Sequence, residues 1–315
     1  MHSVLVTGGS GAFGQAFIRR LLALDVERIA VLSRSESRQA VMKSTFTDPR
    51  LRYLIGDVRD LPRLMFACHG IDTVIHAAAL KRIEVCESDP YEAVETNIRG
   101  TENVARACIA NSVRRAVFLS TDKAAAPNTL YGATKLTAER IWLASNVYAA
   151  GRATRFSATR YGNVLGSTGS VVPMWREQAK TGRISVTDPT MTRFLMTLDD
   201  AVSLVLLTVR DMRGGEVFVP KIGATDLGTL AKAIAPSAEW SVTGLRPGEK
   251  MHEMLVSADE SRHTYDAMTH YIIEPGFPLW ETREALTLPK VPDRFEYRSD
   301  TVQQLTVEEI REMAA

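Results

Sequence analysis

The stretch Ser3-Val-Leu-Val-Thr-Gly-Gly-Ser-Gly-Ala-Phe-Gly14 decides the fold, because an apolar run leads directly into glycines at positions 8, 11 and 14. Ser3 to Thr7 has the pattern of a buried strand, and the apolar spacing from Ala16 to Leu24 predicts a helix after the turn. Such glycines allow a tight turn and a close approach to a pyrophosphate, which the helix N-terminus stabilises. We therefore expect this turn to bind a dinucleotide. The residues assigned to it are Gly8, Ser10, Gly11, Ala12, Phe13 and Gly14.

The alternation of strand and helix patterns continues outward from this turn. Strand-like runs lie at 3–7, 28–32, 51–55, 73–76, 115–119 and 155–160. Helical patterns lie near 14–24, 60–68, 91–110 and 131–149. This order predicts an α/β fold with a Rossmann-like, doubly wound parallel sheet. Ligands of such sheets bind outside the carboxyl ends of the strands.

The rhythm changes beyond Gly162, where loops rich in Gly, Pro, Ser and Thr begin. We expect an NADP-binding domain over 1–165, to which an amphipathic segment, 193–215, returns. A smaller, discontinuous C-terminal substrate lobe would comprise 166–192 and 216–315, with a helix from about Asp226 and a last helix opened by the capping-box pair Thr306 and Glu309. The exact boundary stays open.

Composition excludes several classes of partner. The chain has 315 residues, 45% of them hydrophobic, and 38 basic against 37 acidic residues give a net charge of +1. This balance offers no electrostatic footprint for nucleic acid or an anionic membrane. No apolar run approaches the roughly 18 residues that span a bilayer, and no signal segment precedes the first strand, so we expect a cytoplasmic protein.

The cysteines and histidines predict no metal site. Cys68, Cys86 and Cys108 have no Cys-x-x-Cys spacing and are expected to be reduced thiols. The six histidines include no pair at metal-ligand spacing on a helix, and His76 ends an apolar strand. We therefore expect a structural histidine there and no bound metal.

The residues after the second strand indicate which dinucleotide is bound. An NAD site usually has an acidic residue there, which holds the ribose 2′-hydroxyl. This chain has Ser33-Arg34-Ser35-Glu36-Ser37-Arg38, so hydroxyls and cations occupy the place of a 2′-phosphate. The sequence favours NADP, with Ser33, Arg34 and Arg38 as its contacts. Glu36 leaves open a rotation toward the ribose, as in an NAD site.

An acid–base set follows the fifth strand. Tyr131 and Lys135 are four residues apart, so on a helix they share a face, and a nearby cation favours the phenolate of a phenol whose ordinary pKa is about 10. Thr121, Asp122 and Lys123 precede them at the ligand-binding end of the sheet. Together these side chains predict oxidation and elimination in one pocket. Asp122 and Lys123 alone would be an ordinary solvated ion pair.

Motifs along nearly the whole chain resemble those of the extended short-chain dehydrogenase/reductase superfamily. They are Gly8-x-x-Gly11-x-x-Gly14, Gly56-Asp57-Val58, His76-Ala-Ala-Ala-Leu-Lys81, Thr96-Asn97, Tyr131-x-x-x-Lys135 and Arg160-Tyr-Gly-Asn163-Val. A second set resembles the inverting UDP-N-acetylglucosamine 4,6-dehydratases of pseudaminic acid synthesis. It comprises Ser120-Thr-Asp-Lys-Ala-Ala, Gly169-Ser-Val-Val-Pro173, Met191-Thr-Arg-Phe194, Phe218-Val-Pro-Lys221 and Arg246-Pro-Gly-Glu-Lys250. The pair Asp122-Lys123 distinguishes the inverting dehydratases from the retaining ones, which typically have Asp-Glu at these two positions.

The resemblance implies roles for the acid–base set. Tyr131 would deprotonate the sugar C4 hydroxyl during oxidation by NADP, with Thr121 bonded to the C4 oxygen. Lys123, if held neutral, would remove the C5 proton, and Asp122, if protonated, would protonate the departing C6 hydroxyl. Hydride return to C6 and reprotonation of C5 from the opposite face would give a 4-keto-6-deoxy sugar inverted at C5, with NADP regenerated.

The resemblance also implies the remaining contacts. Further cofactor residues would be Asp57, Val58, Ala77, Ala78, Ala79, Lys81, Asn97, Tyr131, Lys135 and Tyr161. Substrate residues would be Lys81, Thr121, Asn163, Val164, Val172, Thr187, Arg193, Arg246 and Glu249. For Arg193, the choice between substrate contact and lobe packing stays open. Resembling enzymes are homo-oligomers, so we expect one here, although its size stays open.

Two other functions remain as alternatives. A UDP-hexose 4-epimerase shares every cofactor motif and the couple of Tyr131 and Lys135, but it lacks an acid–base pair at Asp122 and Lys123. A non-catalytic dinucleotide-sensing protein is the alternative of another class, because a fold does not fix a function. The selectivity between N-acetyl and hydroxyl groups at sugar C2 depends on the shape of the pocket, so the sequence leaves it open.

Overall fold

The computed structural model describes residues 1–167, 169–277 and 286–314. Residues 168, 278–285 and 315 of the predicted lobe segments lie outside this description. The largest sheet contains β1 (Ser3–Thr7), β2 (Arg28–Ser33), β3 (Leu51–Ile55), β4 (Thr73–His76), β5 (Arg115–Thr121), β6 (Arg155–Tyr161), β10 (Val217–Pro220), β14 (Thr264–Asp266) and β15 (His270–Ile273). The helices along it are α1 (Ala12–Leu22), α2 (Glu36–Thr45), α3 (Leu61–Ala67), α4 (Ile83–Ser88), α5 (Pro90–Val94), the π-helical turn η1 (Glu95–Arg99), α6 (Gly100–Ala110), α7 (Leu130–Tyr148) and α9 (Leu198–Asp211).

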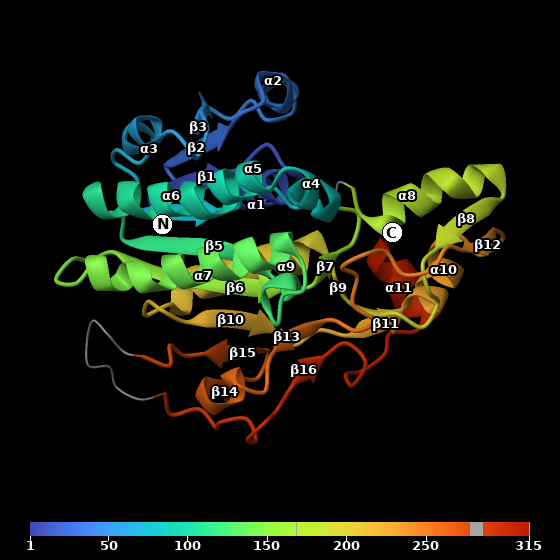
Figure 1. Cartoon of the computed structure of the whole chain (residues 1–315). Helices are drawn as coiled ribbons and strands as arrows, with labels where there is room; N and C mark the ends of the chain where they lie inside the picture. Colours follow the sequence, from blue (N-terminus) through green and yellow to red (C-terminus); the bar gives the residue numbers. More distant parts are fainter. Residues whose placement is uncertain (168, 278–285, 315) are drawn as a thin grey trace.

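The sheet confirms the predicted fold class. Its strand order is β14-β15-β10-β6-β5-β4-β1-β2-β3, and the first six strands of the chain pair in parallel. This 3-2-1-4-5-6 arrangement is that of a doubly wound dinucleotide-binding sheet (Figure 1). The helices α2 and α4 were not predicted, because their sequences carry weak apolar periodicity.

Helices cover both faces of this sheet, as the alternation of side chains along β1 requires. Val4 packs in one core cluster with Phe17 of α1 and Val205 of α9. Leu5, one residue on, belongs to the opposite cluster with Trp142 of α7. The helix α9 therefore lies against the first domain, where its apolar spacing placed it.

The main sheet extends further than the sequence predicted. The strand β10 pairs in parallel with β6, and β15 and β14 follow in antiparallel pairing. Residues 217–220 and 264–273, which were assigned to the substrate lobe, thus lie in the main sheet. The change of rhythm after Gly162 hid this arrangement, because the lobe strands separate β6 from the crossover helix α9 and from β10.

A smaller group of elements lies at the carboxyl side of the sheet (Figure 1). It contains β7 (Asn163–Val164), α8 (Val171–Gln178), η3 (Ala179–Thr181), β8 (Arg183–Val186), β9 (Thr192–Met196), β11 (Ala224–Asp226), α10 (Leu227–Ile234), β12 (Glu239–Val242) and α11 (Val307–Ala314). Its own core joins Trp175, Leu230 and Ile310. The predicted caps are confirmed, because Asp226 caps α10 and Thr306 and Glu309 exchange capping hydrogen bonds at α11.

Between the two groups, β13 (Met254–Val256) pairs with β16 (Tyr297–Arg298), and the short helix η4 (Glu260–His263) follows β13. Arg160, on β6, is fully buried beneath this segment. Its guanidinium donates to Glu139 of α7 at 2.6 Å, to Glu260 at 2.8 Å and to the carbonyl of Leu255 at 3.0 Å. One buried cation therefore fixes β13 and η4 against β6 and α7.

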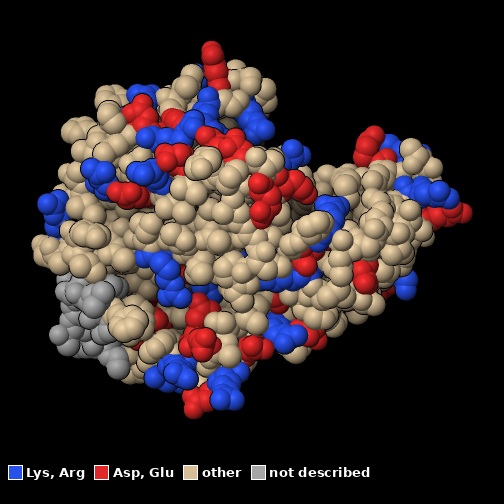
Figure 2. Space-filling model, viewed as in Figure 1, with Lys and Arg blue, Asp and Glu red and all other residues tan. Residues whose placement is uncertain are grey.

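The surface mixes both signs of charge (Figure 2). In the described part of the chain, no helix combines the length and apolarity that crossing a membrane requires. Cys68, Cys86 and Cys108 are free thiols in the core. His76 is also buried, with ring nitrogens 2.7 Å from the Thr7 hydroxyl and 3.0 Å from the Thr101 hydroxyl, so the predicted structural histidine is confirmed.

We expect Arg160→Leu to lower the free energy of unfolding by about 3–5 kcal/mol, because Glu139 and Glu260 would remain buried without their counter-charge. Urea denaturation would measure the loss. Arg183→Leu is the control, since its pair with Glu239 is 67% and 77% exposed, and we expect a far smaller change there. Equal losses in the two variants would show that the buried cluster contributes no more than a surface pair.

Candidate active site

The glycine turn after β1 has the geometry that a pyrophosphate site needs. Gly8 has φ +68°, and a Cβ there would lie 2.8 Å from the backbone nitrogen of Ala78. A Cβ on Gly14 would lie 2.5 Å from Cα of Gly9, so α1 packs directly on the turn. Gly11 is the N-cap of α1, which directs the backbone N–H groups of the helix toward this turn. The predicted residues therefore form a cradle that fits a dinucleotide.

The residues that follow β2 lie beside this cradle. Ser10, Gly11 and Ala12 line one pocket together with Ser37 and Arg38. The hydroxyl of Ser33 accepts a hydrogen bond from Gln39 at 3.0 Å.

Arg34 is half exposed and lies near two carboxylates. Its Nη1 is 3.9 Å from Asp57 and 3.6 Å from Glu92. Burial raises the pKa of Asp57, but hydrogen bonds from Arg59 outweigh it, so the pKa is below its ordinary value. The neighbouring Val58 is buried in the core against α6. Arg34 therefore has anionic neighbours that a bound phosphate would have to compete with.

The loop after β4 is held by Asn97. The side-chain amide of Asn97 accepts from Leu80 N at 2.8 Å and donates to the Leu80 carbonyl at 3.0 Å and to Thr134 of α7 at 3.1 Å. Asn97 thus fixes the segment that contains Ala77, Ala78 and Ala79 at the carboxyl end of β4, and Lys81 follows as an exposed side chain. Asn97 would therefore affect a bound molecule indirectly, by holding this segment in position.

The pair Asp122 and Lys123 lies at the carboxyl end of β5, in the single turn η2 (Asp122–Ala124). Asp122 is 1% exposed and accepts hydrogen bonds from Thr121 Oγ1 at 2.8 Å and Lys123 Nζ at 2.9 Å. Such burial argues against the alternative of a solvated ion pair.

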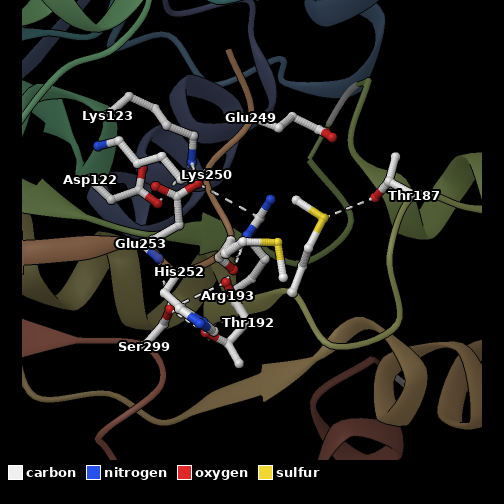
Figure 3. A network of polar contacts seen from close by, with 12 residues as sticks. Asp122, Lys123, Thr187, Thr192, Arg193, Glu249, Lys250, His252, Glu253 and Ser299 are labelled. Carbon is white, nitrogen blue, oxygen red and sulfur yellow. Dashed lines mark hydrogen bonds and ion pairs between the residues drawn. The ribbon is translucent and has the colours of Figure 1, made fainter. Parts of the chain in front are cut away.

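A second carboxylate, from a distant part of the chain, also binds Lys123. Glu253 Oε1 lies 2.9 Å from Lys123 Nζ, and the side chain of Glu253 is only 2% exposed (Figure 3). Burial favours the neutral amine, but Asp122 and Glu253 outweigh it and hold the pKa of Lys123 above its ordinary value. The neutral lysine that the proposed base requires is therefore not the resting state. Glu253 was missed because it lies 130 residues from Lys123 and forms no local motif.

Tyr131 lies near this cluster on the first turn of α7. Burial raises the pKa of the Tyr131 phenol to about 12, while the Lys123 ammonium and a hydrogen bond with Thr121 act in the opposite direction. Lys135 Nζ donates to the carbonyl of Leu119 at 2.7 Å, and burial lowers its pKa to about 7. The cation that favours the phenolate in this structure is Lys123, whereas the expected Lys135 donates its hydrogen bond to the backbone of β5.

Arg193 has one of the two roles that the sequence left open, because its contacts in the structure are internal. It is buried on β9, and its Nη1 donates to the carbonyls of Thr192 at 2.8 Å and Met251 at 3.3 Å. Its Nε is also 3.7 Å from Glu253. Arg193 thus packs inside the lobe and contributes a positive charge beside Asp122 and Lys123.

The structure places the other predicted cofactor and substrate residues on β6, on β7 and in the smaller group of elements. Tyr161 ends β6, and Asn163 and Val164 form β7, which pairs with β9. Val172 lies in the core of the lobe rather than on an open surface, and the Thr187 hydroxyl donates to the sulfur of Met191 at 3.2 Å. These two residues are occupied by internal contacts.

Arg246 and Glu249 lie in one turn, in which Arg246 is exposed and Glu249 is half-buried. Glu249 accepts a hydrogen bond from the Arg246 backbone at 3.2 Å, and Arg246 Nη1 lies 3.8 Å from Glu84 of α4. Glu249 points away from the Asp122–Lys123 cluster in Figure 3. The guanidinium of Arg246 is therefore half exposed to solvent and lies near α4.

A family model described as polysaccharide biosynthesis protein matches residues 4–275. The chain belongs to the polysaccharide biosynthesis protein family. It is 43% identical, over 95% of its length and 92% of the relative's, to the UDP-N-acetylglucosamine 4,6-dehydratase (inverting) of Campylobacter jejuni subsp. jejuni serotype O:23/36, strain 81-176. It is 38% identical to a UDP-glucose 4-epimerase of Rickettsia canadensis, strain McKiel, with 99% and 94% of the two chains covered.

A solved structure agrees with this membership of the polysaccharide biosynthesis protein family. The X-ray structure of Pen from Bacillus thuringiensis matches with a TM-score of 0.92 and 38% identity, over 99% of this chain and 96% of that chain. The resemblance inferred from the motifs is thus confirmed across nearly the full length.

We expect Gly8→Ala to weaken dinucleotide binding at least about tenfold, because the new Cβ would occupy the cradle beside Ala78. Fluorescence titration with NADPH would measure it. Gly151→Ala is the matched control, since Gly151 also has a positive φ, +75°, but no atom lies within 4 Å of the place that its Cβ would take. Both changes carry a similar backbone strain of about 1 kcal/mol, so equal binding would rule out the cradle at Gly8.

Proposed function

We propose that this protein is an NADP-dependent UDP-N-acetylglucosamine 4,6-dehydratase that inverts C5. Its product would be UDP-2-acetamido-2,6-dideoxy-β-L-arabino-4-hexulose. The observation that carries the proposal is the buried pair Asp122 and Lys123 at the carboxyl end of β5, close to Tyr131. The inverting dehydratase relative supports the same reaction.

The chemistry needs a base for oxidation and an acid–base couple for elimination. When bound, the nicotinamide supplies the hydride acceptor at C4 and the hydride donor at C6. Tyr131 removes the proton of the C4 hydroxyl, helped by the Lys123 charge and by the Thr121 hydroxyl, both of which stabilise the phenolate. Its high pKa in the free protein is a consequence of burial, so this help is required for function near neutral pH.

Elimination uses the proton of the hydrogen bond between Lys123 and Asp122. The resting pair is a carboxylate and an ammonium 2.9 Å apart. Transfer of one proton from Lys123 to Asp122 gives a neutral amine and a carboxylic acid without exchange with solvent. The amine then removes the C5 proton, and Asp122 protonates the departing C6 hydroxyl. This internal transfer supplies the neutral lysine that the resting structure lacks.

The cofactor proposal rests on the surroundings of the glycine cradle. Arg38 and Ser37 line the same pocket as Ser10 and Gly11, so a 2′-phosphate bound there would meet a guanidinium and hydroxyls. Arg34 would bind the same phosphate after release from Asp57 and Glu92. These positions support NADP over NAD.

The specific contacts of the sugar nucleotide also belong to the proposal. Lys81 and Asn163 would face the sugar and diphosphate, Arg246 a phosphate, and Glu249 the ribose. Val172 and Thr187 would shape the uridine side through their packing, because their own contacts are internal. The two-lobe division, the cytoplasmic location and a homo-oligomer stay predictions.

A UDP-hexose 4-epimerase is the second candidate, because a relative named UDP-glucose 4-epimerase is 38% identical over 99% of this chain. Incubation with UDP-N-acetylglucosamine in deuterated water, followed by proton NMR, separates the two. We expect a new C6 methyl signal, deuterium at C5 and an L-arabino ring. A D-xylo ring would contradict inversion, and UDP-N-acetylgalactosamine as the sole product would establish an epimerase.

We expect Lys123→Met to lower the rate of dehydration roughly a hundred- to ten-thousand-fold, because it removes the base for the C5 proton. Binding of NADPH should be unchanged, which serves as the internal control for folding. If the protein is an epimerase, interconversion at C4 should fall far less in the same variant, since that reaction needs no C5 base and loses only the help that Lys123 gives to Tyr131.

We expect Arg38→Ala to weaken NADP binding about tenfold, because a charge-assisted hydrogen bond to the 2′-phosphate is lost. The affinity for NAD, which lacks this phosphate, should not change. Isothermal titration with both dinucleotides would measure the ratio. Arg19→Ala is a control from the same pocket, and we expect it to leave the NADP to NAD ratio unaltered.

A further inference from the structure

Glu253 is a buried carboxylate at the catalytic pair that the proposed chemistry does not use. It lies between Lys250 and β13, in a segment far along the chain from Lys123. Its Oε1 binds Lys123 Nζ, whereas its Oε2 is buried without a hydrogen-bond partner among the described residues. A buried oxygen without a hydrogen bond lowers the stability of the folded protein, so we expect a functional reason for its presence.

The contact geometry indicates that Glu253 orients Lys123. An ammonium has three N–H donors. Asp122 Oδ2 and Glu253 Oε1 accept two of them, both at 2.9 Å, and they come from different elements (Figure 3). One direction around Nζ remains for a bound molecule. After transfer of a proton to Asp122, rotation about the Cε–Nζ bond would bring the lone pair of the amine into that direction.

Glu253 is itself fixed independently of Lys123. Its backbone N–H donates to the Ser299 hydroxyl at 2.8 Å. Two residues further on, the Leu255 carbonyl accepts from the buried Arg160 at 3.0 Å. The backbone that carries this buried side chain is therefore fixed without Lys123, so the carboxylate approaches the lysine from a defined direction.

We propose that Glu253 is a positioning residue for Lys123, which orients the ammonium against Asp122 and sets the pH at which Lys123 releases its proton. The inference rests on the proposed function for the identity of the reaction. The position and the charge of Lys123 can be measured without it.

The surrounding charges determine the direction of the effect. Lys123 is faced by Asp122 from its own turn, by Glu253 and Lys250 from the segment before β13, by Arg193 from β9 and by Tyr131 from α7. Removing the charge of Glu253 leaves the cations Arg193 and Lys250 less compensated. Because an adjacent opposite charge raises a lysine pKa, its loss should lower the pKa of Lys123 by about 1–3 units.

The test uses Glu253→Gln, which keeps the shape of the side chain and removes its charge. Reductive methylation of Lys123, followed by mass spectrometry over a pH series, reports the neutral amine. We expect labelling at a given pH below the midpoint to be about tenfold faster or more than in the wild type, as a one-unit fall in pKa requires. In parallel, kcat for UDP-N-acetylglucosamine should fall about tenfold or more, with little change in KM.

Two further variants separate charge from structure. Ser299→Ala loosens the backbone of Glu253 but keeps the carboxylate, so we expect the labelling profile of the wild type. Glu253→Asp keeps the charge but shortens its reach, so labelling should stay close to the wild type while kcat falls. The second variant also serves if the glutamine variant does not fold.

Unchanged labelling in Glu253→Gln, or equally fast labelling in Glu253→Asp and Glu253→Gln, would overturn the inference. If the wild type lacks dehydratase activity, the proposed function is overturned. If Glu253→Gln still shows faster labelling of Lys123 in that case, the positioning of Lys123 by Glu253 stands.

Discussion

The arrangement of the site depends on one constraint, which is that the carboxyl ends of β1, β4, β5 and β6 meet at one edge of the sheet. The glycine cradle, the loop held by Asn97 and the acid–base pair each follow one of these strands. Residues far apart in the chain are brought to one edge in this way. The helix α7 then adds Tyr131 across the end of β5. Each of these placements is a consequence of parallel pairing rather than of local sequence.

The edge is completed by a segment that belongs to neither half of the doubly wound sheet. Residues 250–256 supply Lys250 and Glu253 to the pair at Lys123, and β9 supplies Arg193. Lys123 is thus surrounded by two carboxylates and two further cations. Its protonation depends on how these charges balance, so its chemistry cannot be assigned from η2 alone.

Sequence patterns predicted the elements that local order determines. The glycine turn, the extents of the six strands and the contacts of Thr121 and Lys123 with Asp122 depend on residues close together in the chain. The place of β10, β14 and β15 in the main sheet was missed, because strand pairing across a long insertion leaves no periodic signal. Glu253 was missed for the same reason. The partner of Lys135 was wrong because helical spacing fixes a shared face but not where a long side chain ends.

The buried cluster of Arg160, Glu139 and Glu260 has a consequence for how related chains can diverge. A neutral residue in place of Arg160 would leave two carboxylates without their cation in the core, whereas loss of one glutamate would still leave an arginine–carboxylate pair, so a single change at Arg160 should be eliminated by selection. Homologues that replace Arg160 should therefore also have exchanged both carboxylates. Over evolutionary time, three positions far apart in the chain would behave as a single inherited unit.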